Sequence, residues 1–134
     1  MRLTTFTDLA LRLLIELARR GGEQATIGDI ARRYNMSANH LAKVVVRLAS
    51  CGVLHTVRGR HGGVTLARAP AQIGIGEVVR ASEPDFCMVD CFDADHASCC
   101  YAGNCGVQRV LGRATDAYLA ALDKLTLADL VLSA

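Results

Sequence analysis

Residues 37–68, SANHLAKVVVRLASCGVLHTVRGRHGGVTLAR, decide the fold of this chain. The first half begins with Ser37, a residue type that caps helix N-termini, and ends at Gly52, a typical helix C-cap. Between them, apolar residues recur at helical spacing, at Leu41, Val44, Val45 and Leu48. The second half alternates apolar and polar residues on both sides of a glycine-rich turn. We therefore predict a helix followed by a two-stranded β-hairpin.

Two helices are predicted before this stretch. In the N-terminal segment, apolar residues fall at three- and four-residue steps and form one stripe: Leu3, Phe6, Ala10, Leu13, Leu14 and Leu17. The opposite, polar face of this helix is expected to carry Asp8, Arg12, Glu16 and Arg19. Further on, Thr26 followed by Asp29 is typical of a helix N-terminus, with Asp29 in the place of the Glu or Gln of a capping box.

The order of helix, short helix, turn, longer helix and basic hairpin is that of a winged helix-turn-helix. After the hairpin, residues 73–82 predict a short helix and residues 107–132 a long amphipathic one. The predicted fold class is mainly α, a winged helix-turn-helix with a small β-hairpin wing and a long C-terminal dimerisation helix. The expected parts are a DNA-binding domain (1–70), a linker helix with a cysteine-rich cluster-binding loop (71–106), and a dimerisation helix with a C-terminal tail (107–134).

The last predicted helix has an apolar face too broad to remain in water. It comprises Val107, Val110, Leu111, Ala114, Ala117, Tyr118, Ala121, Leu122 and Leu125. Either the helix packs back on its own domain or it pairs with its twin in a two-fold dimer. Because a single winged helix can cover only part of such a face, we expect a homodimer.

Length and charge set the remaining bounds. A chain of 134 residues with 51% hydrophobic and 21% charged residues is typical of one globular domain. No segment has the ~18 uninterrupted apolar residues of a membrane span, and we expect a cytoplasmic protein with reduced thiols. No catalytic triad, phosphate-binding loop or buried carboxylate pair is recognisable, so we do not expect an enzyme.

The predicted second helix of the helix-turn-helix carries side chains suited to the major groove. Its candidate DNA contacts are Ser37, Asn39, His40, Lys43 and Arg47. Asn can bridge an adenine edge, Lys can reach a guanine, and Ser more often holds a phosphate. The hairpin tip adds Arg58, Arg60 and His61, as in a wing that contacts phosphates or the minor groove. We expect binding to double-stranded DNA, and a dimer would read an inverted repeat.

Five of the six cysteines lie in residues 85–107, DFCMVDCFDADHASCCYAGNCGV. Structural zinc favours tight C-x2-C pairs, and none is present. Instead, Cys91, Cys99 and Cys105 have C-x7-C-x5-C spacing, wide enough to surround a cluster. Cys87 and Cys100 are additional thiols, and the adjacent pair Cys99 and Cys100 leaves a zinc-binding or thiol-redox DNA-binding protein as an alternative.

Several of these motifs together resemble a known family. The segment LTTFTDLALRLLIELA, the helix-turn-helix, the wing RGRHGGV and the loop opening VDCFD are similar to the Rrf family of winged-helix iron–sulfur regulators, most closely to its nitric-oxide-sensing repressors. The resemblance covers nearly the whole chain. The family's cluster-status regulators carry a His where Gln108 stands here, a departure that favours the nitric-oxide-sensing members.

The resemblance implies an iron–sulfur cluster in each subunit of a dimer, 4Fe-4S with 2Fe-2S as the alternative. The implied ligands are Cys91, Cys99 and Cys105, with Asp8 of the partner subunit as the fourth. Cys100 could replace Cys99, and Cys87 could replace Asp8, which as a plain helical carboxylate would pair with Arg12.

The resemblance also implies a function. It indicates a transcriptional repressor that releases operator DNA when nitric oxide attacks the cluster, with an iron–sulfur or iron-status regulator as the alternative.

Overall fold

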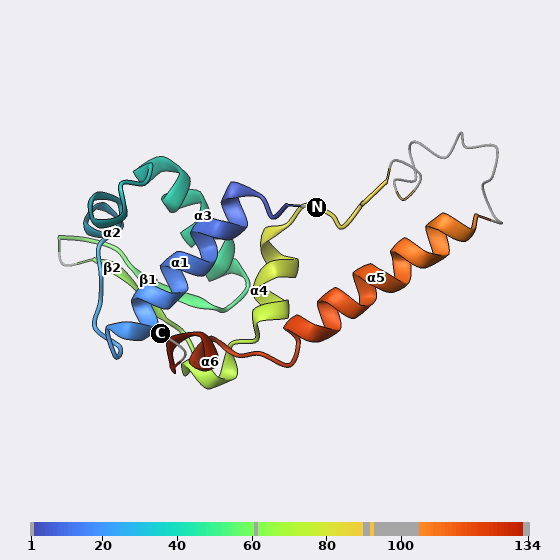
Figure 1. Cartoon of the computed structure of the whole chain (residues 1–134). Helices are drawn as coiled ribbons and strands as arrows, with labels where there is room; N and C mark the ends of the chain where they lie inside the picture. Colours follow the sequence, from blue (N-terminus) through green and yellow to red (C-terminus); the bar gives the residue numbers. More distant parts are fainter. Residues whose placement is uncertain (1, 61, 90–91, 93–104, 133–134) are drawn as a thin grey trace.

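The computed structural model describes residues 2–60, 62–89, 92 and 105–132. In chain order these form α1 (Thr5–Arg19), α2 (Ile27–Tyr34), α3 (Ala38–Ser50), β1 (Leu54–Val57), β2 (Gly63–Leu66), the short 3-10 helix η1 (Pro70–Gln72), α4 (Ile75–Ser82), α5 (Gly106–Leu122) and α6 (Leu127–Leu132). All of them gather in one body except α5, which runs outward from it (Figure 1). None of the described helices is both long enough and apolar enough to cross a membrane.

Helix α1 lies at the centre of this body and packs against α3, α4, α6 and β2. The predicted apolar stripe faces the core: Leu13, Leu14 and Leu17 are fully buried, while Leu3 and Phe6 pack at its edge. Helix α3 contributes the predicted residues Leu41, Val44, Val45 and Leu48, all buried. Both helices therefore form because their apolar side chains share one face, which is removed from water on folding.

The helix-turn-helix forms as predicted. The Thr26 hydroxyl accepts a hydrogen bond from the backbone N–H of Asp29 at 3.0 Å and donates to the Asp29 carboxylate at 2.7 Å, which closes the predicted capping arrangement at α2. Asn35 ends α2 in the left-handed region with φ of 51°, a conformation that Asn tolerates well. The chain then turns directly into Ser37, whose hydroxyl caps α3.

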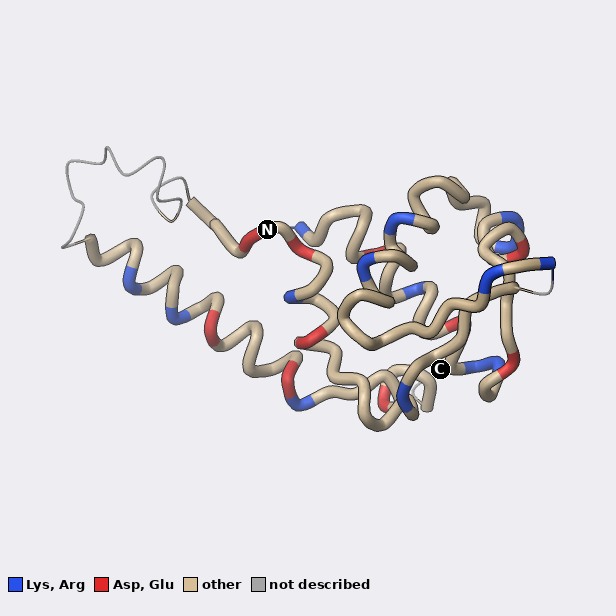
Figure 2. The backbone as a smooth tube through the Cα atoms, turned by 180° about the vertical axis from the view of Figure 1, so that it is seen from behind, with Lys and Arg blue, Asp and Glu red and all other residues tan. Residues whose placement is uncertain are grey.

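Strands β1 and β2 form the predicted antiparallel hairpin, with Leu54 opposite Leu66 and Val57 opposite Gly63. Backbone hydrogen bonds between Ala25 and Val64 fix it to the segment before α2. Gly63 is required there, because a Cβ atom would lie 2.7 Å from the Ala25 carbonyl oxygen. The hairpin extends from the body and carries basic residues towards its tip (Figure 2).

The prediction of one helix over residues 107–132 is wrong. Helix α5 ends at Leu122, and α6 begins at Leu127 after a turn. Asp123 accepts two hydrogen bonds from Arg80 of α4, at 2.5 and 2.7 Å. The Leu127 N–H then donates to the Ile73 carbonyl at 2.9 Å, and the Leu127 side chain is fully buried. The helix breaks because these contacts return the chain to the body.

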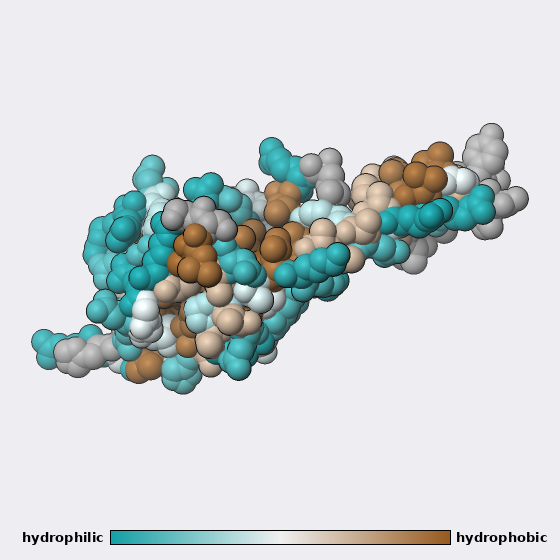
Figure 3. Space-filling view, turned by 60° about the horizontal axis from the view of Figure 1, so that its bottom comes forward, coloured by the Kyte–Doolittle hydropathy of each residue, from teal (hydrophilic) through white to brown (hydrophobic). Residues whose placement is uncertain are grey.

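Helix α5 contacts α4, and most of its apolar face lies at the surface. Val107 and Val110 are exposed, with 62% and 64% of their area accessible, whereas Leu111 and Tyr118 are half-buried. Apolar side chains are prominent along the projecting helix in Figure 3. Within the described residues of one subunit, most of this face is therefore uncovered.

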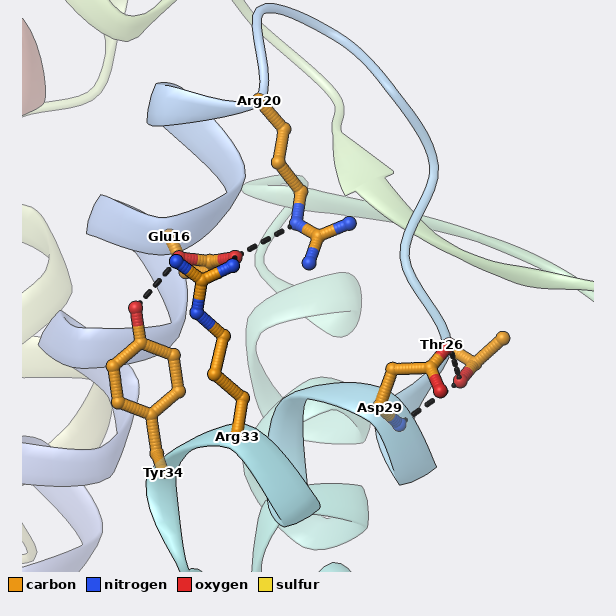
Figure 4. Close-up of polar contacts among 6 residues, drawn as sticks. All are labelled: Glu16, Arg20, Thr26, Asp29, Arg33 and Tyr34. Carbon is orange, nitrogen blue, oxygen red and sulfur yellow. Dashed lines mark hydrogen bonds and ion pairs between the residues drawn. The ribbon is translucent and has the colours of Figure 1, made fainter.

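Glu16 was expected on the polar face of α1, and this prediction is wrong: its exposed fraction is only 3%. Its carboxylate accepts hydrogen bonds from Tyr34 Oη at 2.6 Å and Arg20 Nε at 2.9 Å, and Arg33 Nη1 lies 3.4 Å away (Figure 4). Tyr34 and Arg33 belong to α2. A buried carboxylate on α1 thus holds the first helix of the DNA-binding motif.

Burial alone would raise the pKa of Glu16, but the hydrogen bonds from Tyr34 and Arg20 and the positive charges of Arg33 and Arg20 outweigh it. The pKa therefore lies below that of an ordinary glutamate. A carboxyl group with a lowered pKa in the folded state stabilises the fold above its unfolded pKa, ~4.3. That contribution is lost as the pH falls through the lower, folded value.

We expect Glu16→Gln to lower the free energy of unfolding by about 1–3 kcal/mol at pH 7, because Arg20 and Arg33 lose their carboxylate partner. The difference from the wild type should shrink as the pH falls below the unfolded pKa of ~4.3 and towards the lower pKa that Glu16 has in the folded protein. Urea unfolding of the cluster-free protein between pH 7 and pH 3 measures both effects. Glu23→Gln, at an exposed glutamate, is the matched control. An unchanged stability at pH 7 would contradict the assignment.

Candidate DNA-binding surface and cysteine loop

The exposed face of α3 carries the predicted groove-contacting side chains. Asn39, His40 and Lys43 are exposed, and the buried residues of α3 hold the helix against the core on its other side. Ser37 has a local role, since its hydroxyl accepts the His40 N–H at 3.4 Å and begins the helix. The polar face is thereby presented from a fixed helix, the arrangement in which a recognition helix enters the major groove.

Arg47 has a partner that the sequence did not reveal. Its Nε donates to the backbone carbonyl of Ala81, in α4, at 2.8 Å. This bond satisfies one of the last carbonyl groups of α4 and ties α3 to that helix. Sequence pattern gives no signal for a contact between residues 34 positions apart. Because Arg47 is also exposed, its contact with DNA stays a prediction.

The wing presents Arg58 and Arg60, both exposed, at its tip. His61, the third predicted wing residue, lies outside the described residues. Arg68 follows β2 but faces the body, where it pairs with Glu77 at 2.6 Å and donates to the carbonyls of Gly52 and Gln72. Arg58 and Arg60 are thus exposed at the hairpin, and with Lys43 of α3 they stay candidate phosphate contacts.

The cysteine loop lies only partly within the described residues. Cys91, Cys99 and Cys100 fall outside them, so their placement stays a prediction. Cys105 is half-buried and is the N-cap residue of α5, with no hydrogen bond from its side chain to the helix backbone. Helix N-termini favour negative charge, which suits an anionic thiolate ligand. The described part of the chain holds no group of three or more potential metal ligands.

Cys87 is exposed and lines a cavity of about 460 Å³ between the N-terminus, the segment after α4 and α5. In the same segment, Glu83 accepts hydrogen bonds from the Thr4 backbone N–H at 2.8 Å and from the Thr4 hydroxyl at 3.1 Å. Thr4 is the N-cap of α1. The chain leading to the cysteine loop is therefore attached to the start of α1, although the two lie 79 residues apart.

Asp8 lies in the first turn of α1 with its side chain about half exposed. Within one chain it forms the i,i+4 pair with Arg12 that helix geometry predicts, at 3.0 Å. Such an exposed pair contributes only a few tenths of a kcal/mol. The Asp8 carboxylate consequently lies at the surface and is not part of the buried core.

Comparison with known proteins agrees with this architecture. Residues 3–133 match the family model described as "Rrf2: Iron-dependent Transcriptional regulator". The chain is 52% identical to the HTH-type transcriptional regulator NsrR of Bacillus subtilis, over 98% of this chain and 90% of that protein. It is 42% identical to the HTH-type transcriptional repressor NsrR of Streptomyces coelicolor, over 98% and 88%.

Among solved structures, the cysteine regulator CymR of B. subtilis superimposes with a TM-score of 0.79 at 27% identity, over 100% of this chain and 98% of that one. The predicted fold class and the resemblance drawn from the wing, the helix-turn-helix and the cysteine loop are both confirmed. Because the family model and the relatives cover almost the whole chain, the protein belongs to the Rrf2 family of DNA-binding transcriptional regulators.

Proposed function

We propose that this protein is a homodimeric repressor that binds an inverted-repeat operator and releases it when nitric oxide reacts with an iron–sulfur cluster. The observation that carries the proposal is the exposed polar face of α3 beside a basic wing, in a chain 52% identical to a regulator named NsrR. An exposed recognition helix and a basic wing are the parts that a winged-helix repressor uses on DNA.

The proposed cluster ligands are Cys91, Cys99 and Cys105 with Asp8 of the partner subunit. A bound cluster would supply iron that reacts with nitric oxide. The described donors suit it, because Cys105 stands at a helix N-terminus and the carboxylate of Asp8 is exposed. Cys100 is the alternative to Cys99, and Cys87 the alternative fourth ligand.

Helix α1 offers a route from this site to the DNA-binding surface. Asp8 lies near its first turn, and Glu16 lies two turns further along the same helix. Glu16 holds Tyr34 and Arg33 of α2, and α2 leads through the turn at Asn35 into α3. A force on Asp8 would move α1 as a unit, and the Glu16 contacts would carry the movement to α2 and α3. Such coupling is worth typically 1–3 kcal/mol, or 5- to 150-fold in affinity.

The dimer is proposed to form through α5. Its exposed apolar residues Val107 and Val110 lie on the helix that projects from the body, where a second copy could cover them (Figure 1). Pairing this helix with its twin removes apolar surface from water on both subunits, which a monomer leaves exposed.

The decisive experiment follows the cluster and operator binding together. Anaerobically purified wild-type protein should show iron–sulfur absorption, and nitric oxide should lower its operator affinity by 5- to 150-fold. Asp8→Ala should weaken or lose the cluster, whereas Cys87→Ala should keep it. Absorption spectroscopy and fluorescence anisotropy measure the two responses. Cluster loss in Cys87→Ala alone would name Cys87 as the fourth ligand, and operator affinity that ignores nitric oxide would refute the sensing function.

Replacing Arg60 by alanine should weaken binding to specific and unrelated DNA alike, because an exposed wing arginine contacts phosphates rather than bases. The slope of log affinity against log salt concentration should fall by about 1. Lys124→Ala removes the same charge from an exposed position between α5 and α6 and serves as the control. Equal effects of the two variants would show that only net charge matters.

Val110→Asp should convert the dimer to a monomer without unfolding it, because Val110 is 64% exposed in the single subunit. A buried carboxylate without a partner would cost the interface several kcal/mol. Leu132→Asp, at a residue 84% exposed on α6, is the control and should leave the dimer intact. Sedimentation velocity distinguishes the species. A Val110→Asp protein that remains dimeric would place the interface elsewhere.

A further inference from the structure

Val46 is an apolar side chain on the exposed face of the recognition helix. It is 70% exposed, although its neighbours Val44 and Val45 are buried. It follows Lys43 by three residues and Asn39 by seven, so all three lie along one stripe of α3. A large apolar side chain that is 70% exposed gains little from burial in the free protein, and its position on this stripe points to a contact made with a ligand.

A groove lies beside Val46, between α3, the start of α2 and the wing, with a volume of about 400 Å³. Ile27, Ala42 and Val46 line it on the helical side, and Val57 and Arg58 on the wing side. Val57 is also exposed, at 44%. The surface is therefore apolar within the groove and basic at one edge.

The positive charges around the groove favour DNA as its occupant. Lys43 stands one turn before Val46 on α3, and Arg58 and Arg60 extend from the adjacent wing. An apolar protein surface would gain nothing from these cations, whereas the DNA backbone offers phosphates to them while its bases face the helix. Within the major groove, base edges are polar except for the 5-methyl group of thymine.

We propose that Val46 contacts the 5-methyl group of a thymine in the major groove and thereby selects thymine at one position of each operator half-site. The assignment rests on the DNA-binding surface described above and adds a base preference to it. Burying one methyl group corresponds to roughly fourfold in affinity for one half-site. In a symmetric dimer on two half-sites the effect becomes about fifteenfold.

The test uses an operator duplex selected from a random pool by the wild-type protein. Each thymine is replaced in turn, in both half-sites, by deoxyuridine, which lacks the methyl group and keeps the base pairing. At one position, deoxyuridine should weaken wild-type binding about fifteenfold. Val46→Ala should bind the unmodified duplex more weakly by a similar factor. Its affinity should not change further when that one thymine is replaced by deoxyuridine.

Leu132→Ala truncates another exposed apolar residue and should retain the full wild-type response to deoxyuridine. Because Val46 is exposed and alanine favours helices, Val46→Ala should unfold at the same urea concentration as the wild type or at a slightly higher one, which excludes a folding defect. Identical deoxyuridine profiles for the wild type and Val46→Ala would overturn this assignment alone. A wild-type protein that selects no duplex would overturn the proposed function and this assignment with it.

Discussion

The buried carboxylate of Glu16 joins the helix at the centre of the core to the first helix of the DNA-binding motif. An unpartnered charge at that depth would be very costly, so the site exists only while Tyr34, Arg20 and Arg33 converge on it. Because two of these partners come from α2, the carboxylate fixes how α2 lies against α1. Because only the tight turn at Asn35 separates α2 from α3, the orientation of α2 also constrains that of α3.

The same helix is also held at its other end. Glu83 binds the N-cap residue Thr4, so the segment that leads to the cysteine loop is attached to α1 at its first turn. Between Asp8 and Glu16, α1 rises by about 12 Å, and a packed helix of this length moves as a unit. One rigid helix therefore carries the contact with Glu83 at Thr4, the candidate ligand Asp8, and the contact with α2 at Glu16. A shared rigid element of this kind is what physical coupling between sites requires.

Local signals made most of the fold predictable, and long-range contacts account for the errors. Thr26 and Asp29 indicate the start of α2. The same pattern at Thr126 and Asp129 begins α6, but apolar residues continue at helical spacing across the break and hide that signal. Glu16 follows the four-residue spacing of the polar residues Asp8 and Arg12 in α1, and nothing in the sequence shows that Tyr34 approaches it. The recognition helix and wing were predictable from caps, periodicity and glycines, whereas the cysteine ligands rest on spacing and resemblance.

The arginines near the recognition surface serve two purposes, and the division bears on how the protein reads DNA. Arg47 and Arg68 are bound to backbone carbonyls and Glu77, so they position α3 and the wing. In the proposed DNA complex, phosphate attraction would then come mainly from Lys43 and the wing tip, and such attraction is salt-sensitive and shared by all sequences. Phosphate contacts carry no sequence information directly, so the proposed complex would distinguish sequences largely through short-range contacts along the exposed stripe of α3, where hydrogen bonds and apolar contacts with base edges are both available.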